Sequence, residues 1–272
     1  TSWLHHLPQK FHQPIVTLIR SHEYMLESEV NSFIDRVKEL DTPNRSLFLI
    51  KKVADYNGTH RILYRDNEIG RGVATFTPRS ITKGSDQVTL ITDLVLTGSQ
   101  VKRALKFYLK GEGSRPNDNY FEFTQEDHTN LFDIFSGLEV LDICTVLYTE
   151  NAIQKIQEAL QEILDNEIKV NVKHGRNIGD NAFFGSTTKI NQHEKSIIMN
   201  SLLNDYALSD LYDHLSHSGV CPKYQNTNEI NRMNLVARYQ SLPKKSFSFL
   251  TCSTSLDENC KPFNRILELA DK

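Results

Sequence analysis

The sequence has few cysteines, almost no excess of charge of one sign and no long apolar run. None of its four cysteines lies in a Cys-x-x-Cys pair, so neither a dense disulfide framework nor a common zinc motif is expected. The formal charge of −3, from 31 basic and 34 acidic residues, gives no overall positive field to bind a nucleic acid. No run approaches the roughly 20 apolar residues that span a bilayer, and the polar N-terminus does not resemble a signal peptide. These absences predict a cytoplasmic protein with no membrane partner.

The rest of the composition is that of an ordinary folded domain. Hydrophobic residues make up 39% and charged residues 24% of the chain, close to the average for globular proteins. The length fits one large α/β domain. We therefore predict a single domain over residues 1–272, with a helical region at 1–45, an insert at 111–135 and a C-terminal extension at 190–272.

Apolar residues recur along the chain with two periods. Short alternating or continuous runs predict strands, and spacings of three and four predict helices. Because strands and helices alternate, the predicted fold class is α/β, with a mainly parallel sheet and helices on both faces. His174 and Arg176 are expected in a loop after the strand at 168–172, as polar surface. The predicted strands are 47–50, 61–65, 72–77, 88–92, 142–148, 168–172 and 246–251, and the predicted helices lie within 15–40 as one helix or two, and at 99–110, 151–164 and 194–217.

The segment from residue 88 to residue 100 combines a strand, an acid and a turn that opens a helix. Ligands of open α/β sheets bind beyond the carboxyl ends of the strands, where helix N-termini offer unpaired amides. The amides of residues 97–100 and the hydroxyls of Thr97 and Ser99 could bind a phosphate, and Gly98 would allow close approach. Asp93 would then face the sugar and accept hydrogen bonds from two ribose hydroxyls. With Mg²⁺, the same carboxylate could help to place a pyrophosphate.

This segment resembles the fingerprint of the type I phosphoribosyltransferases, which is an apolar strand, two acids, a short spacer and Thr-Gly-x-Thr. Residues 88–91 match the strand, Asp93 matches the second acid, and Thr97 with Gly98 matches the phosphate turn. Thr92 replaces the first acid and Gln100 replaces the final threonine. The resemblance implies a phosphoribosyltransferase-like fold and a reaction at ribose C1 with Mg²⁺, in which Asp93 is catalytic. The ribose-5-phosphate site that it implies consists of Thr92, Asp93, Thr97, Gly98, Ser99 and Gln100.

Five basic residues could contact a pyrophosphate in such a site. Lys51 and Lys52 follow the first predicted sheet strand, where type I enzymes place a pyrophosphate-binding loop. Arg71, Arg79 and Lys83 precede the fingerprint, where the family keeps a mobile loop. Exposed cations are also common on ordinary surfaces and sheet edges, so solvated surface charge is the alternative for all five.

The chain also resembles, more loosely, the phosphoribosyltransferase-like effectors of bacterial conflict systems, some of which accompany retron reverse transcriptases in phage defence. Beyond the fingerprint, this likeness rests on the N-terminal helix, the region 69–72 and the block 235–265. It implies an effector or toxin that depletes or modifies a host nucleotide or RNA. It also implies a partner, a reverse transcriptase with its RNA–DNA hybrid.

Three functions stay open at this level. The first is an enzyme that binds phosphoribosyl pyrophosphate or a related nucleotide and acts at ribose C1. The second, favoured by Thr92 in place of an acid, is a catalytically degenerate module that senses a nucleotide or docks a partner. The third, a transcription regulator, lacks an evident helix-turn-helix. A purely structural alternative also exists, in which Asp93 only caps amides and Thr97 with Gly98 only makes a bend.

Overall fold

The structure, a computed structural model, describes residues 2–49, 58–64, 66, 81, 87–113, 123–216, 227–237, 248–251 and 253–254. The chain divides into two compact units, each with more contacts inside it than to the other. Residues 27–179 form the first, which we call the sheet unit, and residues 1–26 with 180–272 form the second, the helical unit. Contacts do not measure independent folding, so the single domain expected from the sequence stays a prediction.

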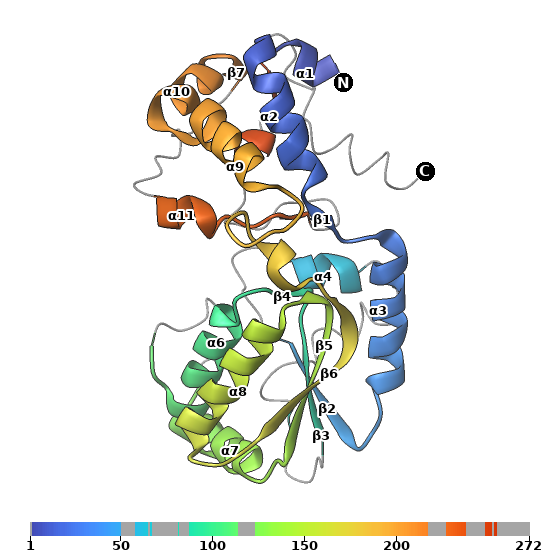
Figure 1. Ribbon diagram of the computed structural model, residues 1–272. Helices are drawn as coiled ribbons and strands as arrows, with labels where there is room; N and C mark the ends of the chain where they lie inside the picture. Colours follow the sequence, from blue (N-terminus) through green and yellow to red (C-terminus); the bar gives the residue numbers. More distant parts are fainter. Residues whose placement is uncertain are drawn as a thin grey trace. The chain divides into compact units, whose positions relative to one another are not determined.

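The sheet unit is built on parallel strands (Figure 1). Its five-stranded sheet contains β2 (Arg45–Leu49), β3 (Gln87–Ile91), β4 (Leu94–Val95), β5 (Val140–Tyr148) and β6 (Lys169–Asn177). β2 pairs with β3, both β3 and β4 pair with β5, and β5 pairs with β6. Every one of these pairs is parallel. The predicted α/β class with a mainly parallel sheet is therefore confirmed.

β3 and β4 are two pieces of one strand. Ile91 lies opposite Cys144, and Leu94 lies opposite Leu147. The step from the first pair to the second is three residues on both strands, so the register does not change between the pieces. Pairing with β5 therefore continues past residue 92, where the sequence predicted the strand to end.

Backbone hydrogen bonds bridge the interruption between the two pieces. The amide of Thr92 donates to the carbonyl of Cys144 at 3.1 Å. The carbonyl of Asp93 accepts from the amides of Val146 and Leu147 at 3.1 and 3.2 Å. These bonds keep the main chain at residues 92 and 93 paired with β5 across the interruption.

Helices cover both faces of the sheet, as predicted (Figure 1). On one face α3 (Glu27–Leu40) contacts β5 and β6. On the other face lie α6 (Ser99–Lys110), α7 (Gln125–Ser136) and α8 (Glu150–Leu164), which pack on one another. The buried stripe of α3 has the helical spacing seen in the sequence and consists of Val30, Phe33, Ile34, Val37 and Leu40.

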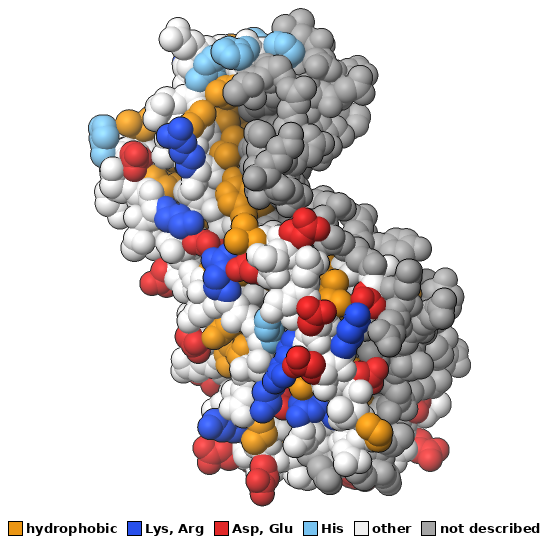
Figure 2. All heavy atoms as spheres, turned by 90° about the vertical axis from the view of Figure 1, so that its right-hand side faces the viewer, with side chains coloured by type: hydrophobic (Ala, Val, Ile, Leu, Met, Phe, Trp, Pro, Cys, Tyr) orange, Lys and Arg blue, Asp and Glu red, His pale blue; other side chains and the backbone are white. Residues whose placement is uncertain are grey.

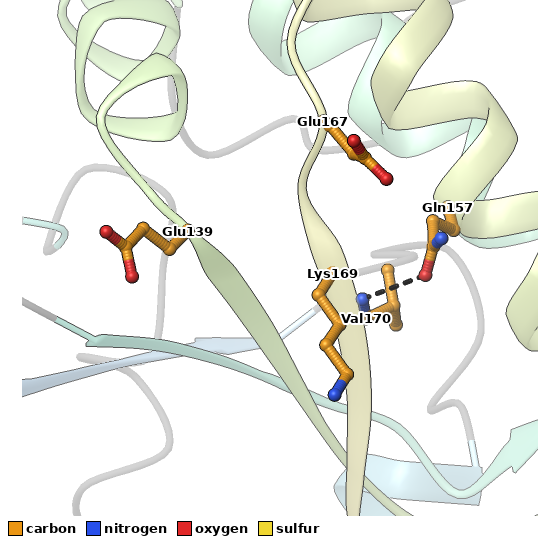
Figure 3. Close-up of a pocket in the computed structure, with 5 residues that line it drawn as sticks. All are labelled: Glu139, Gln157, Glu167, Lys169 and Val170. Atoms are coloured by element: carbon orange, nitrogen blue, oxygen red, sulfur yellow. Dashed lines mark hydrogen bonds between the residues drawn. The ribbon is translucent and has the colours of Figure 1, made fainter.

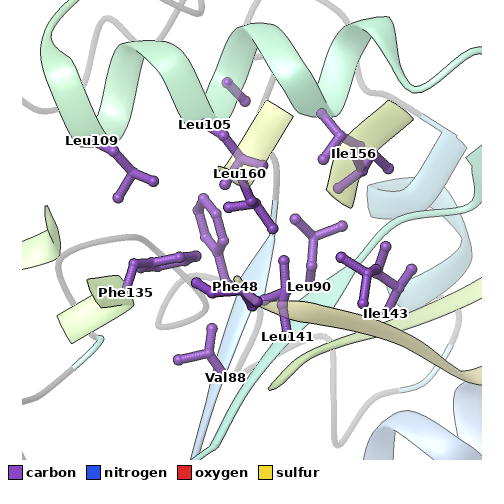
Figure 4. Close-up of a cluster of buried hydrophobic side chains, with 14 of the residues drawn as sticks. Phe48, Val88, Leu90, Leu105, Leu109, Phe135, Leu141, Ile143, Ile156 and Leu160 are labelled. Carbon is purple, nitrogen blue, oxygen red and sulfur yellow. The ribbon is translucent and has the colours of Figure 1, made fainter. Parts of the chain in front are cut away.

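The core between the sheet and α6, α7 and α8 is formed by alternate strand residues and by helix stripes (Figure 4). Because successive strand side chains point to opposite faces, Val88 and Leu90 of β3 share this face with Leu141 and Ile143 of β5. Burying side chains of this size contributes about 1.5–3 kcal/mol each, so this core is the main source of stability in the sheet unit. The helix residues that meet them include Leu105, Leu109, Phe135, Ile156 and Leu160.

Local signals fix where these helices begin and end. The side chain of Thr149 accepts a hydrogen bond from the amide of Ala152 and caps α8. Thr124 and Asp127 form a capping box at the start of α7. α6 ends at Gly111, whose φ of 68° is in the left-handed region that glycine adopts without strain.

The helical unit contains α1 (Ser2–His5), α2 (Gln9–Arg20), α9 (Gln192–Ile198), α10 (Asp205–Asp213) and α11 (Thr227–Asn231), with a π-helical turn at Met199–Leu203 and 3-10 turns at Gly179–Ala182 and Ser248–Thr251. β1 (Glu23–Tyr24) pairs with β8 (Val236–Ala237), and β7 (Leu215–Ser216) pairs with β9 (Ser253–Thr254). Within the described ranges, no helix is both long and apolar enough to cross a bilayer. The core of this unit includes Phe11, Leu18, Phe184, Leu202, Leu208 and Phe249.

Two predicted strands are wrong. The strand predicted at 61–65 overlaps a short helix, α4 (Gly58–Leu63). Its buried residues Thr59, Ile62 and Leu63 have helical spacing, but a run this short does not separate helix from strand. The strand predicted at 246–251 contains the 3-10 turn at Ser248–Thr251 instead. The strand predicted at 72–77 lies outside the described residues.

One strand extends beyond its predicted bounds, and one helix lies where no helix was predicted. β6 continues through His174 and Arg176 to Asn177, so the loop expected there is wrong. The extension follows β5, which pairs with β6 as far as Tyr148 opposite Asn177. Helix α7 begins at Gln125, inside the predicted insert 111–135. The region 15–40 contains two helices, α2 and α3, with β1 between them.

Candidate functional site

The predicted ribose-5-phosphate site lies where β4 leaves the sheet and α6 begins. All six residues are described and belong to one continuous stretch of chain. Thr92 and Asp93 form the interruption between β3 and β4, and Thr97 with Gly98 leads into α6. The stretch lies at the carboxyl edge of the parallel sheet, where ligands of such sheets bind.

Gly98 is required by packing between two helices. Its φ is +69°, and a Cβ at this position would lie 2.9 Å from the carbonyl oxygen of Ala152 in α8. Both properties exclude an unstrained side chain, so glycine lets α6 start close to the backbone of α8. The other role expected of Gly98, close approach to a phosphate, stays a prediction.

The side chains around Gly98 face solvent. Thr97, Ser99 and Gln100 are all exposed. The hydroxyl of Thr97 accepts from the amide of Ser99 at 3.4 Å and donates to the Ser99 hydroxyl at 3.2 Å. The first turn of the 12-residue helix α6 contains no acidic residue, so no carboxylate opposes an anion at the positive end of the helix. We call residues 97–100 the bend; it offers hydroxyls and helix amides of the kind that bind a phosphate.

Asp93 is in a different environment, because its side chain is inside the protein. Only 3% of the residue is exposed. Its Oδ1 accepts a hydrogen bond from the hydroxyl of Thr59 at 2.8 Å, and its amide donates to the same Thr59 oxygen at 2.9 Å. Thr59, in α4, is itself 1% exposed. The expected orientation of Asp93 toward a bound sugar is therefore not present in this state of the chain.

β4 separates Asp93 from the bend. Val95 at its end accepts a hydrogen bond from the amide of Thr149 at 3.0 Å, and Leu96 accepts one from the Thr149 hydroxyl at 2.9 Å. These bonds fix the spacer between the acid and the bend to the start of α8. The structure thus brings the two halves of the predicted site to one edge of the sheet, with the acid buried and the side chains of Thr97, Ser99 and Gln100 exposed.

Two threonines that sequence reasoning did not select contact Asp93. Thr59 bonds its carboxylate and its amide, and the hydroxyl of Thr145 in β5 donates to its carbonyl at 3.1 Å. Thr145 is fully buried. Neither threonine belongs to a motif, and both are far from residue 93 in the chain, so no local signal could have identified them.

The five predicted pyrophosphate contacts lie outside the described residues. They are Lys51, Lys52, Arg71, Arg79 and Lys83. β2 ends at Leu49, opposite Ile91 of β3. The chain therefore leaves β2 at the edge of the sheet where Thr92 follows β3, which is the edge that the prediction requires.

His174 and Arg176 connect β6 to α3. The ring of His174 lies 6.4 Å from that of Phe33, centroid to centroid, and burial, reinforced by the nearby Arg36 guanidinium, lowers the pKa of His174. Arg176 donates from Nε to Glu29 at 2.5 Å. These contacts give both residues a packing role in place of the predicted solvated loop.

Cys144 has the core role that the sequence predicted. It is fully buried in β5 and is a free thiol. Burial raises its pKa to about 12. A thiol that stays protonated at neutral pH is a poor nucleophile and a poor metal ligand.

The described residues do not by themselves form a site for Mg²⁺. Among them, no three His, Cys, Asp or Glu side chains gather in a way that could ligate a metal ion. Asp93 is the only acid of the fingerprint, and its carboxylate is bonded to Thr59.

Acidic and basic side chains are intermixed on the face of the sheet unit that carries α3 (Figure 2). Arg45 donates to Asp142 at 2.7 Å, and Lys173 lies 3.5 Å from the other oxygen of the same carboxylate. Arg36 pairs with Glu39 at 2.5 Å. The described part of this face therefore carries charges of both signs, several of them paired with one another.

A pocket of about 430 Å³ lies at the opposite edge of the sheet from the predicted site (Figure 3). Glu139 precedes β5, and Lys169 begins β6, so the pocket is at the amino ends of the strands. Gln157 of α8 accepts a hydrogen bond from the amide of Val170 at 3.2 Å across its wall. Glu167 completes the lining. Ligands of parallel sheets bind at the other edge, so this pocket does not alter the choice of site.

Comparisons with protein-family models, with curated proteins and with solved structures gave no match for this chain. The case for any function therefore rests on the geometry of residues 92–100 and on the residues that contact them.

Proposed function

We propose that this protein binds phosphoribosyl pyrophosphate or a related nucleotide at the bend formed by residues 97–100. One observation carries the proposal. A Thr-Gly-Ser bend, with exposed Thr97 and Ser99 on either side of the buried Gly98 and no acid in the turn that follows, opens a 12-residue helix at the carboxyl edge of a parallel sheet. Backbone amides and the positive end of the helix favour a phosphate at such a place.

In the fuller form of the proposal, the protein is a phosphoribosyltransferase-like effector of a bacterial anti-phage defence system that acts at ribose C1 in the cytoplasm. Asp93 would accept hydrogen bonds from the ribose hydroxyls, and Mg²⁺ would enter with the pyrophosphate. Lys51, Lys52, Arg71, Arg79 and Lys83 are the candidate cations around the departing pyrophosphate. Preorganised amides and cations stabilise charge as it develops in a transition state.

A second candidate is a catalytically degenerate module that senses a nucleotide or docks a reverse transcriptase with its RNA–DNA hybrid. Two observations favour it. Thr92 replaces an acid that holds the ribose in the family the chain resembles, and the remaining acid, Asp93, is buried against Thr59. A buried carboxylate can keep an architectural role after a reaction is lost.

Calorimetric titration with phosphoribosyl pyrophosphate and Mg²⁺ tests the proposal. We expect micromolar binding by the wild type and at least tenfold weaker binding by Gln100→Glu, because the new carboxylate would lie in the first turn of α6, where it repels an anion. Thr129→Val is the matched control, since Thr129 is also an exposed helix residue but lies on α7. Equal binding by Gln100→Glu and the wild type would contradict a site at the bend.

Product analysis separates the two candidates. Mass spectrometry of the titrated mixture should show cleavage or transfer at ribose C1 if the protein is an enzyme. Binding without product would support the sensing module. If neither the wild type nor any variant bound the ligand, the proposed sugar-phosphate site would be refuted, and only the partner-docking function would stay open.

A further inference from the structure

The carboxylate of Asp93 already bonds a hydroxyl group. The Thr59 hydroxyl donates to Oδ1 at 2.8 Å and accepts from the Asp93 amide at 2.9 Å. One hydroxyl supplies one donor and two acceptor positions, so it can make both bonds at once. Thr59 and Asp93 are 1% and 3% exposed, so the pair is enclosed.

A ribose hydroxyl would make the same bond to Asp93. It too is an alcohol O–H that donates to a carboxylate oxygen at about 2.5–3.0 Å. The two alcohols therefore compete for one acceptor. A ribose hydroxyl can therefore take the place of Thr59 on Oδ1 only after the Thr59 hydroxyl has left it.

Competition between Thr59 and a ribose hydroxyl for Asp93 would involve helix α4, because Thr59 belongs to it. α4 lies near the end of the sheet where β4 lies (Figure 1), and Ile62 and Leu63 of α4 are buried in the sheet unit. Among the α4 side chains that the structure describes, that of Thr59 bonds Asp93. Breaking this contact would remove the Thr59 donor from the carboxylate and leave the main-chain bonds of Asp93 to β5 in place.

We propose that Thr59 is an autoinhibitory residue, whose hydroxyl occupies on Asp93 the place of a ribose hydroxyl. A phosphorylated ribose binds fully only when α4 releases Asp93. The inference rests on the proposed function, because it assigns regulation to the same site. A closed state of this kind lowers the apparent affinity by the fraction of molecules that are open.

Three variants test the inference by titration with phosphoribosyl pyrophosphate and Mg²⁺. Thr59→Val removes the hydroxyl and keeps the shape, so it leaves a buried carboxylate without this donor and should favour the open state. We expect its affinity to rise by about tenfold, the effect of losing one hydrogen bond to a charged group in the closed state. Thr59→Ser keeps the hydroxyl and should bind like the wild type.

Thr187→Val is the matched control for the loss of a buried hydroxyl. Thr187 is also 1% exposed and donates to a side-chain oxygen, that of Asn181, but in the helical unit. It should not change the affinity. Circular dichroism of each variant confirms that the comparison is made between folded proteins.

Hydrogen exchange of residues 58–64 without ligand gives a second readout. Thr59→Val should exchange faster there than Thr59→Ser, because an opened helix loses the protection of its amides. Equal or weaker binding by folded Thr59→Val, with binding by the wild type intact, would overturn the inference alone. Faster exchange with no binding by any variant would refute the proposed function and, with it, the assignment of Thr59 to a sugar site.

Discussion

The two halves of the 92–100 segment differ in what they can do for a ligand. Asp93 is 3% exposed and has hydrogen-bonded neighbours in α4 and β5. The bend at residues 97–100 has exposed side chains and the free start of a helix. A single fingerprint therefore contains an architectural half and an accessible half. Substitutions of Asp93 should change stability, and substitutions of the exposed side chains of the bend should change binding; the buried Gly98, which packs against α8, belongs with Asp93 in this respect.

The largest effect on stability is expected at Gly98, which packs against the backbone of helix α8. Gly98→Ala would put a Cβ 2.9 Å from the Ala152 carbonyl at a φ of +69°, and we expect a loss of about 3 kcal/mol in the free energy of unfolding by urea. Gly113→Ala is the control, because Gly113 also has positive φ (89°) but nothing within 4 Å of the added Cβ. It should lose only about 1 kcal/mol. Equal losses for the two variants would show that backbone strain at positive φ, and not the contact with α8, explains why position 98 requires glycine.

The next effect is expected at the acid. Asp93→Ala removes the acceptor of the Thr59 hydroxyl inside the protein, and we expect a loss of about 2 kcal/mol in the free energy of unfolding. Urea denaturation gives the value. A double-mutant cycle with Thr59→Val should show coupling, because each residue completes the hydrogen bond of the other. A loss below 0.5 kcal/mol would place Asp93 in the accessible half.

A smaller effect is expected at Thr145. Its hydroxyl donates to the carbonyl of Asp93 at 3.1 Å, but that carbonyl also accepts from Val146 and Leu147. Thr145→Val should therefore cost about 1 kcal/mol, the typical value for one neutral hydrogen bond. Thermal unfolding of the wild type and the variant measures it. No loss, or a loss as large as that of Asp93→Ala, would contradict the hydrogen bonding described here.

The smallest effect on stability is expected at Thr97, an exposed side chain of the bend. Thr97 is exposed, and its hydroxyl accepts from Ser99 at a long 3.4 Å. Thr97→Ala should change the free energy of unfolding by less than about 0.5 kcal/mol, yet it should weaken binding of phosphoribosyl pyrophosphate. Parallel denaturation and titration would show the separation. If Thr97→Ala lost stability but kept its affinity for phosphoribosyl pyrophosphate, Thr97 would belong to the architectural half of the segment and not to the accessible half.

The sequence predicted the elements of this segment well, because their signals are local. The strand predicted at 88–92 is β3, shifted by one residue, and the helix predicted at 99–110 has the observed bounds. Both follow from apolar periodicity, with glycine just before and just after the helix. β4 was missed because Leu94–Val95 is too short to have a period, and its pairing partner is β5.

The environment of Asp93 could not be predicted, because it depends on residues distant in the chain. Thr59 is 34 residues away, and Thr145 is 52 residues away. The sequence predicted a strand at 61–65, next to Thr59. It therefore gave no reason to expect a helix that places Thr59 beside Asp93. An acid after a buried strand has the same sequence signature whether it faces a ligand or a neighbouring threonine.

The main-chain pairing of Asp93 with β5 also bears on how this position could change. Its carbonyl oxygen, which every amino acid carries, accepts from two amides of β5. The path of the strand at residue 93 is thus specified by the main chain, and the side chain is free to vary with its neighbour in α4. A library that randomises positions 59 and 93 together should yield folded proteins with new pairs, and so with new chemistry on an unchanged sheet.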